Sequence, residues 1–256
     1  MRRTAILFLV MIVLGWTGAV YAAGQEDEPK DIPSPMKKAK AGGIDFGLFV
    51  SAGKAVRMFD FDRLNSRLAV ASRTPFTGYI DDWNFEIGGV ATGNGIFTLG
   101  GGFYKTETGG DRIDAELSGY EIMARWGGAV NKSKIVMLSP TFGIGYAAHT
   151  LSLDGDLGLL DLEHLPRHGS ADLRQAGMML EAGFRADLFG AWPDDTKFAF
   201  LSVESLTIGW QGIPIASEWT EGDKTVDGLP DDFTHSLFVR LSIGLGGAGR
   251  GSEEKK

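Results

Sequence analysis

Apolar and polar residues alternate along much of the chain with a period of two, as they do in a β-strand whose two faces meet different surroundings. The clearest run extends from Ala176 to Leu188, where Leu180 and Phe184 share one face and Glu181 and Arg185 share the other. The pattern therefore predicts a protein built of strands that each have one apolar and one polar face.

Eight segments carry this alternation, and the links between them differ in length. The segments are residues 44–51, 83–92, 97–103, 112–128, 136–149, 176–188, 197–210 and 237–245. Longer links at 52–83, 105–111, 150–173 and 211–232 alternate with tight turns around Asn94-Gly95, Asn131-Lys132-Ser133 and Pro193-Asp194-Asp195. Asparagine followed by glycine is a strong hairpin signal. An up-and-down barrel that crosses a membrane has this alternation of links, with both of its ends on the side of the short turns.

Strand length separates a membrane barrel from a soluble one. Soluble strands usually stop after about 5–6 residues. The segments at 112–128, 136–149 and 176–188 keep their pattern for longer, as a tilted bilayer crossing requires. The sequence therefore predicts an all-β fold: an antiparallel up-and-down transmembrane β-barrel of about eight strands, spanning residues 44–246.

The segment at 112–128 reverses its pattern halfway along. Its second half places Tyr120 and Trp126 on the apolar face, whereas its first half has apolar residues on the opposite parity. An extra residue in one strand would produce such a reversal, so we expect a β-bulge near Gly119.

A short helix is predicted inside the first long link, at residues 62–72. Leu64 and Leu68 are spaced by four residues and follow Asp62, a residue type that often begins helices. We interpret this segment as a loop packed over the barrel mouth, in preference to a functional plug or lid.

The beginning of the chain has the features of a cleaved export signal. Arg2-Arg3 is positively charged, Ala5–Leu14 is apolar, and Val20-Tyr21-Ala22 has small residues at the cleavage positions. The apolar run is shorter than the roughly 20 residues that span a bilayer. We expect a signal peptide at residues 1–22, followed by a flexible, charged and proline-bearing periplasmic leader at 23–43.

Composition narrows the possible partners. Loss of the two arginines in the signal takes the formal net charge from −8 to −10, and an acidic chain is repelled by nucleic-acid phosphates. The sequence has no cysteine, which excludes disulfides and a lipidated cysteine anchor. Glycine accounts for 37 of 256 residues, a composition that suits closely packed strands and tight turns.

With its signal peptide, amphipathic strands, alternating links and final strand at 236–245 (SLFVRLSIGL), the chain resembles the small eight-stranded barrels of bacterial outer membranes, such as the OmpA transmembrane domain and the OmpX and OmpW groups. The resemblance implies a location in the outer membrane with both termini in the periplasm. It also implies contact with membrane lipid and lipopolysaccharide, and handling by the barrel-assembly machinery. Such barrels commonly end on an aromatic residue, whereas Leu245 here precedes a polar periplasmic tail at 247–256.

The polar face of the predicted strands collects charged residues. They are Asp45, Glu86, Glu121, Arg125, Glu181, Arg185, Glu204 and Arg240. Eight strands enclose only enough room for side chains to fill, and unpaired charges in such a space are costly. We therefore expect a salt-bridged network that fills the lumen, in preference to an ion-conducting path.

Aromatic residues gather near the ends of the predicted strands. They are Trp83, Phe103, Trp126, Phe189, Trp192, Trp210 and Phe233. In a membrane barrel such rings form girdles at the two lipid–water interfaces, whereas in a soluble barrel they would be core or ligand-stacking groups. We expect the girdles.

Polar residues that could support catalysis lie mostly in or near the long links. They are His149, Ser152, Glu163, His164, His168 and His235. They form no serine-hydrolase elbow and no HExxH or His-x-Ser motif, and Asp154-Gly155-Asp156 lacks the glycine and final glutamate of a calcium loop. The sequence therefore predicts no catalytic residue, no metal site and no cofactor.

Three hypotheses about function follow. The first is a non-enzymatic outer-membrane barrel with a side-chain-filled interior, which presents long loops at the cell surface for envelope structure or surface interaction. The alternative is a narrow porin-like channel or carrier for small solutes. The second alternative is a soluble periplasmic ligand binder of the lipocalin type.

Overall fold

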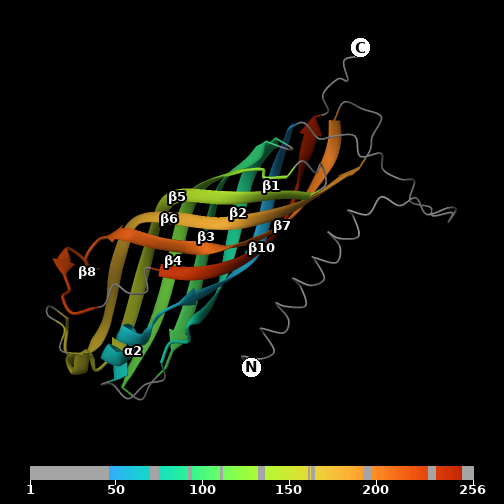
Figure 1. The fold of residues 1–256 in the computed structure, drawn as a ribbon. Coiled ribbons are helices and arrows are strands. Elements are labelled where there is room, and N and C mark those ends of the chain that lie inside the picture. Colours follow the sequence, from blue (N-terminus) through green and yellow to red (C-terminus); the bar gives the residue numbers. More distant parts are fainter. Residues whose placement is uncertain are drawn as a thin grey trace, which may run out of the picture. The chain divides into compact units, whose positions relative to one another are not determined.

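A computed structural model describes residues 46–69, 75–91, 94–109, 112–131, 136–160, 162, 165–192, 198–229 and 235–249. Within these residues, long antiparallel strands curve into a barrel (Figure 1). The predicted signal peptide and leader, and Asp45, lie outside the described residues.

The barrel consists of eight long strands. These are β1 (Phe46–Phe59), β2 (Tyr79–Ala91), β3 (Gly95–Thr108), β4 (Ile113–Gly128), β5 (Val136–Gly155), β6 (Gly169–Trp192), β7 (Phe198–Ala216) and β10 (His235–Gly249). They pair in the order β5-β4-β3-β2-β1-β10-β7-β6, and the pairing of β5 with β6 closes the ring. The prediction of an all-β, antiparallel, eight-stranded barrel is confirmed.

The links contain the remaining elements. These are helix α2 (Asp62–Leu68), the 3-10 helix η2 (Leu157–Leu160), and the short strands β8 (Thr220–Glu221) and β9 (Lys224–Thr225). In the part of the chain that the structure describes, neither helix has the length and apolar character needed to cross a bilayer.

The two ends of the barrel differ. One end, called the turn end here, carries the links β2–β3, β4–β5 and β6–β7 together with Phe46 and Gly249, which pair with each other. The opposite end, called the loop end, carries the links that contain α2, η2 and the β8–β9 hairpin. The predicted strict alternation of long and short links is wrong, because β3 and β4 continue into the longer link predicted at 105–111 and leave only residues 109–112 between them. The last strand likewise runs to Gly249, three residues past the predicted barrel end at 246.

The outside of the barrel carries an apolar belt. Its large, exposed members include Leu48, Val50, Phe85, Ile87, Leu99, Ile122, Phe142, Ile144, Phe184, Ile208, Leu241, Ile243 and Leu245. A continuous apolar surface around a barrel is unfavourable in water and matches the lipid-facing band of membrane barrels. The polar phase of the same strands points into the lumen.

Nearer the loop end, the polarity of the two faces reverses while the backbone phase does not. On β4 the odd-numbered side chains point inward throughout: Ile113 and Leu117 are apolar, whereas Glu121 and Arg125 are charged. The pairing of β4 with β3 and with β5 continues without a shift across Gly119, so the predicted bulge is wrong. The reversal has a different cause: beyond the belt the inside is an apolar core and the outside is exposed to water.

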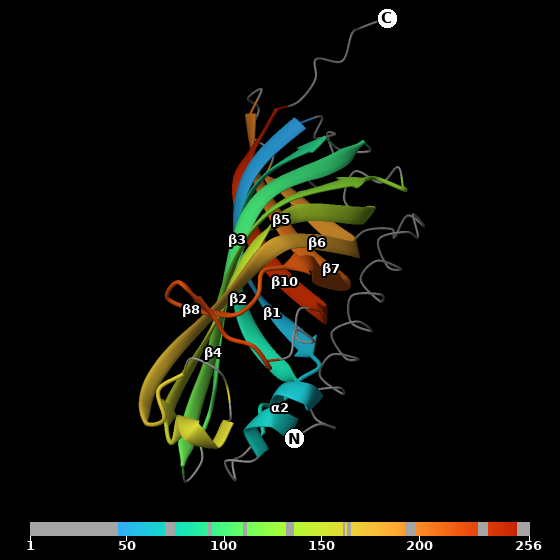
Figure 2. The same ribbon diagram turned by 90° about the vertical axis from the view of Figure 1, so that its left-hand side faces the viewer.

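This inner core is called the loop-end apolar cluster here. Its members are Phe59, Phe61, Leu64, Leu68, Phe76, Ile80, Tyr104, Ile113, Ala115, Leu117, Leu151, Leu153, Leu157, Leu160, Ala171, Leu173, Trp219 and Val226. They come from the inner face of the extended strands, from α2 and η2, and from link residues beside α2 and beside the β8–β9 hairpin. Figure 2 shows α2 at this end of the barrel. The loop end is therefore packed like the interior of a soluble domain.

Helix α2 contributes to this packing. Leu64 and Leu68 are 1% and 2% exposed, so the predicted short helix and its apolar face are confirmed, although the helix ends at Leu68 and not at residue 72. The side-chain amide of Asn65 donates to the carbonyl of Phe76 at 3.1 Å, and its oxygen accepts from the Phe76 backbone N–H at 2.8 Å. These two bonds fix the helix to the chain that enters β2.

A charge placed on the apolar belt tests its orientation. Ile243→Arg puts a guanidinium where the side chain is 69% exposed between Leu241 and Leu245, and a charge at mid-membrane costs about 2–4 kcal/mol. We expect this variant to fold in detergent or lipid with markedly lower yield and stability than wild type. Ser170→Arg is the matched control, because Ser170 also points outward but lies beyond the belt, on the exposed start of β6. Equal losses in the two variants, measured by heat-modified gel mobility and urea unfolding, would contradict the assignment of the belt.

Candidate functional site in the barrel interior

The middle of the lumen is filled by charged side chains. They are Arg57 on β1, Asp82 and Glu86 on β2, Glu121 and Arg125 on β4, Glu181, Arg185 and Asp187 on β6, and Arg240 on β10. Every one of these side chains is at most 5% exposed. Each lies on the inward phase of its strand, so strand periodicity and barrel closure together bring them into contact.

Two arginines and Glu181 form the centre of this network. Arg125 Nε donates to Glu181 Oε1 at 2.9 Å, and Arg240 Nη2 donates to Glu181 Oε2 at 3.0 Å. Arg125 also reaches Glu86 Oε1 at 3.4 Å and Glu121 Oε1 at 3.2 Å. The two guanidiniums thus lie among three carboxylates from three strands, which compensates the cost of burying them.

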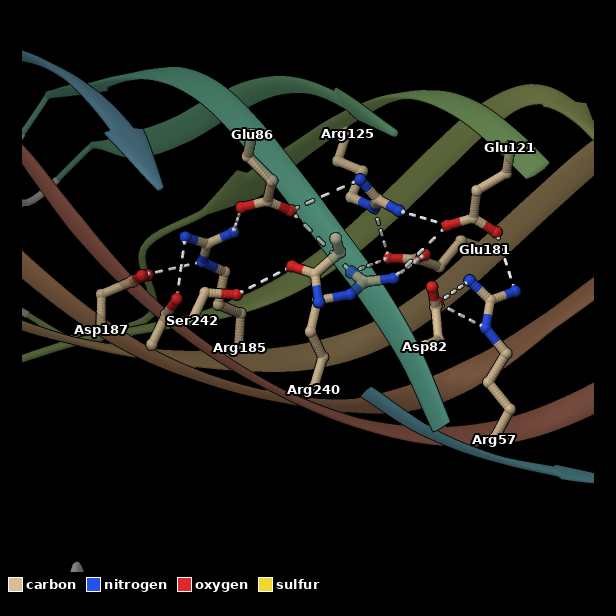
Figure 3. A network of polar contacts seen from close by, with 12 residues as sticks. Arg57, Asp82, Glu86, Glu121, Arg125, Glu181, Arg185, Asp187, Arg240 and Ser242 are labelled. Carbon is tan, nitrogen blue, oxygen red and sulfur yellow. Dashed lines mark hydrogen bonds and ion pairs between the residues drawn. The ribbon is translucent and has the colours of Figure 1, made fainter. Parts of the chain in front are cut away.

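The network extends from this centre in both directions (Figure 3). Toward the loop end, Arg57 Nη1 lies 2.8 Å from Glu121 Oε2, and Arg57 also donates to Asp82 Oδ2 through Nε at 2.7 Å and through Nη2. On the other side, Arg185 donates from Nη1 to Glu86 Oε2 and from Nε to Asp187 Oδ1, both at 2.8 Å. Arg240 also lies 3.9 Å from Glu86 Oε1 and from Glu121 Oε1, so every arginine of the network is within ion-pair distance of more than one carboxylate.

Glycines on the inner wall make room for these long side chains. A Cβ added at Gly143 would lie 3.2 Å from both Arg125 Cγ and Glu181 Cβ, and one added at Gly100 would lie 2.9 Å from Glu86 Cγ. Larger residues at these two positions would displace the ion pairs. Part of the high glycine content thus reflects the size of the network.

Six of the predicted interior residues lie together in this network. They are Glu86, Glu121, Arg125, Glu181, Arg185 and Arg240. Glu204 was expected on the same face, but it is exposed on the outside of β7, because Val203 and Ser205 occupy the inward phase there.

Three members of the network were not among the predicted residues. Arg57 and Asp82 fell within the first predicted link, whereas the structure extends β1 to Phe59 and begins β2 at Tyr79. Asp187 lies on the same phase as Glu181, which is the polar face that the alternation predicts, but it was not included in the expected network. Continuing the strand phase into the predicted link would have identified the other two.

Apolar side chains close both ends of the charged region. The loop-end apolar cluster lies on one side, and a turn-end apolar cluster lies on the other: Phe49, Val90, Ile96, Met137, Phe189, Leu201, Val203 and Ala248. A cavity within the charged region has a volume of about 10 Å³, which is room for roughly one water molecule. The described part of the lumen is therefore filled from end to end.

The aromatic residues expected in the girdles divide into three groups. Trp83, Phe103, Trp126 and Trp210 are exposed on the outside of the barrel. Phe189 is 5% exposed and packs in the turn-end apolar cluster, so its assignment to a girdle is wrong; it has the inward phase of Asp187. The side chain of Trp192 and the whole of Phe233 lie outside the described residues.

The outer aromatic rings gather at two levels. Phe103 is paired across strands with Trp83 and Tyr120, nearer the loop end. Trp126 is paired with Phe97 and Phe142, nearer the turn end. Two separated rows of rings are typical of the two interfaces of a membrane.

The polar residues considered for catalysis are dispersed. His149 is buried and bonded through Nδ1 to the hydroxyl of Tyr104, His168 lies 3.3 Å from Asp156, and His235 stacks on an aromatic ring of β7. Ser152 Oγ donates to an aspartate on β6, and Glu163 and His164 lie outside the described residues. Across the described ranges, no three His, Cys, Asp or Glu side chains are grouped so that they could hold a metal ion.

No protein-family model matches the chain, and no curated protein matches it in sequence. Among solved structures, Ail, the attachment invasion locus protein of Yersinia pestis, is 13% identical with a TM-score of 0.39, over 80% of this chain and 99% of that chain. Neisserial surface protein A is 11% identical with a TM-score of 0.33, over 81% and 99%. The N-terminal barrel of Pseudomonas aeruginosa OprF is 16% identical with a TM-score of 0.33, over 80% and 98%.

The strand pairing and the apolar belt of this chain define its class by themselves. It is a small, closed, eight-stranded antiparallel membrane β-barrel with a charged interior. The resemblance to the small outer-membrane barrels is confirmed at the level of architecture.

Removing one member of a buried ion pair tests the network. Arg240→Met leaves Glu181 with one guanidinium instead of two, and Glu181→Gln leaves Arg240 without its nearest carboxylate. We expect each single variant to lower the free energy of unfolding by about 3–5 kcal/mol, and the double variant to cost much less than the sum of the two.

The control for this double-mutant cycle is an exposed pair. Lys105 Nζ lies 2.9 Å from Glu116 Oε2 on the outside of the extended strands, and such pairs couple by about 0.2–1 kcal/mol. Both cycles can be measured by urea unfolding in detergent micelles. A coupling between Arg240 and Glu181 no larger than that of the exposed pair would refute the buried network.

Proposed function

We propose that the protein is a non-enzymatic integral barrel of the bacterial outer membrane, with a closed lumen and a rigid extension at the cell surface. The observation that carries this proposal is the filled lumen: paired charges occupy its middle and apolar clusters occupy both ends. A barrel without a path through it acts through its outer surface and its ends.

The belt supports a position in the membrane, and the predicted export signal supports delivery across the inner membrane. In this proposal the belt contacts outer-membrane lipid and lipopolysaccharide. The barrel-assembly machinery receives the chain through its final strand. Both chain ends are periplasmic, because the described barrel begins and ends at the turn end.

The loop end is then the surface-exposed part. Strands β3 to β6 continue past the belt as a sheet whose outward side chains are polar and whose inward side chains pack in the loop-end apolar cluster. On the outward side, hydrogen bonds to Glu107 and Glu116 raise the pKa of Lys105 above its ordinary value. Such a sheet is a preformed surface for envelope structure or for interaction outside the cell.

The channel hypothesis requires an open path, and the soluble ligand-binder hypothesis requires a polar exterior. The cavity of about 10 Å³ at Arg125 and Arg240 is far smaller than the several hundred Å³ typical of ligand pockets. The apolar belt would be exposed to water in a periplasmic protein. The small cavity therefore argues against a channel and against a ligand pocket, and the apolar belt argues against a soluble periplasmic protein.

Conductance measurements test the closed lumen. Refolded protein in planar bilayers is expected to produce no discrete conductance steps, because the charged side chains are paired and both ends are packed. A porin in the same bilayers serves as the positive control. The double variant Arg125→Ala/Arg240→Ala removes two guanidiniums from the centre of the lumen. Steady steps in wild type that this double variant alters would show that ions pass through the lumen, and would contradict the proposal.

Epitope insertion tests the orientation. Gly222 is an exposed residue in the turn between β8 and β9 at the loop end, and Asn94 is an exposed residue in the turn between β2 and β3 at the turn end. An epitope after Gly222 should bind antibody on intact cells, whereas the same epitope after Asn94 should bind only after the outer membrane is permeabilised. The opposite result would show that the turn end, and not the loop end, is at the cell surface.

A further inference from the structure

The buried charges of the barrel interior do not balance. In the described part of the chain, the buried arginines are Arg57, Arg125, Arg185 and Arg240, and the buried carboxylates are Asp82, Glu86, Glu121, Glu181 and Asp187. Four positive charges therefore meet five negative charges in a space closed to water. An uncompensated charge in such surroundings is costly, and a buried group commonly becomes neutral instead.

The carboxylates with the fewest arginine partners lie at the two ends of the network. The ion pairs form a chain of alternating sign that has an aspartate at each end, Asp187 beside Arg185 and Asp82 beside Arg57 (Figure 3). Each of these aspartates has one oxygen, Oδ2 of Asp187 and Oδ1 of Asp82, that accepts no hydrogen bond. The glutamates between them are each bonded to two arginines.

The two aspartates are not equally stabilised as anions. Asp82 accepts two hydrogen bonds from Arg57, through Nε and Nη2. Asp187 accepts one, from Arg185 Nε at 2.8 Å, while Nη1 of the same arginine is directed to Glu86. Hydrogen bonds from cationic donors stabilise the ionised form of a carboxyl group. Asp187 therefore has the weakest support for a negative charge in the network.

No other charged side chain approaches Asp187 among the described residues of the neighbouring strands. The inward side chains beside it are Met137 and Ser139 on β5 and Val203 and Ser205 on β7. The charged groups that face Asp187 are Arg185 on its own strand and Glu86 across the lumen. Asp187 and Glu86 share the guanidinium of Arg185. The side chain of Asp187 is itself 0% exposed.

We infer that Asp187 is a proton-binding site, at which the folded barrel holds one proton at neutral pH. The proton lies on Oδ2, the oxygen that accepts no hydrogen bond. A metal cation is the less suitable ligand, because the cavity of about 10 Å³ in the charged region has three arginines and only one carboxylate, Glu181, in its lining, and Asp187 does not line it. A proton requires no additional room.

The bound proton makes the interior neutral and fixes the role of Arg185. With Asp187 neutral, four guanidiniums face four carboxylates, and the charge of Arg185 is available to Glu86. Loss of the proton would leave two carboxylates competing for one guanidinium. The folded barrel therefore binds more protons than the unfolded chain at neutral pH, and its stability at this site decreases as pH rises.

Infrared spectroscopy detects the proton directly. Refolded wild-type protein at neutral pH should show one C=O stretching band of a buried, protonated carboxyl group, which shifts when H₂O is replaced by D₂O. Asp187→Asn should lack this band, whereas Asp82→Asn should retain it. Absence of the band in wild type, or its survival in Asp187→Asn, would overturn the inference.

Unfolding measurements on the same variants provide an independent test. Asparagine has the shape of a protonated aspartate, so Asp187→Asn should keep the wild-type urea midpoint at neutral pH and exceed it at alkaline pH. Asp82→Asn is the matched control, because it removes an ionised partner of Arg57 and should lower the midpoint at neutral pH. Failure of Asp187→Asn to fold, in conditions where Asp82→Asn folds, would contradict a neutral Asp187.

Discussion

Closure of the barrel is the constraint on which the rest of this structure depends. Each long strand pairs on both sides, so successive residues point alternately inward and outward; the exception is a register shift where Met178–Leu180 of β6 pairs with the end of β7. The polarity of a residue must then match the surroundings on the face to which it points: lipid or water outside, and charged or apolar side chains inside. On β4 the outward side changes from lipid at Ile122 to water at Glu116, and the inward side changes from charges at Glu121 to an apolar core at Leu117.

The same constraint explains why the interior is charged and still stable. Inward positions of a narrow barrel lie within a few ångströms of one another, so arginines and glutamates from different strands meet without any local sequence signal between them. Arg125, for example, contacts Glu86, Glu121 and Glu181. Pairing across the lumen lowers the cost of burying these charges, and apolar clusters lie at both ends of the charged region. Stability and closure of the lumen are thus two results of one arrangement.

Much of this interior could be read from the alternation of residues. Glu181 and Arg185 were placed correctly because their strand repeats without interruption. Arg57 and Asp82 were missed because the segment between them lacks the apolar-outside pattern and was assigned to a link. Glu204 was misplaced because the phase of its strand is ambiguous without its partners on β6 and β10.

The sequence by itself determined that the protein is a membrane barrel of about eight strands, since a period of two with one apolar face follows from local order alone. Only the tertiary structure decided where that pattern applies. The reversal at Gly119 looks like a bulge in the sequence, but the continuous pairing of β4 shows that the medium changes and the backbone does not. The tertiary structure also decided which charges pair, because Arg185 and Glu86 lie 99 residues apart in the chain and meet only when the barrel closes.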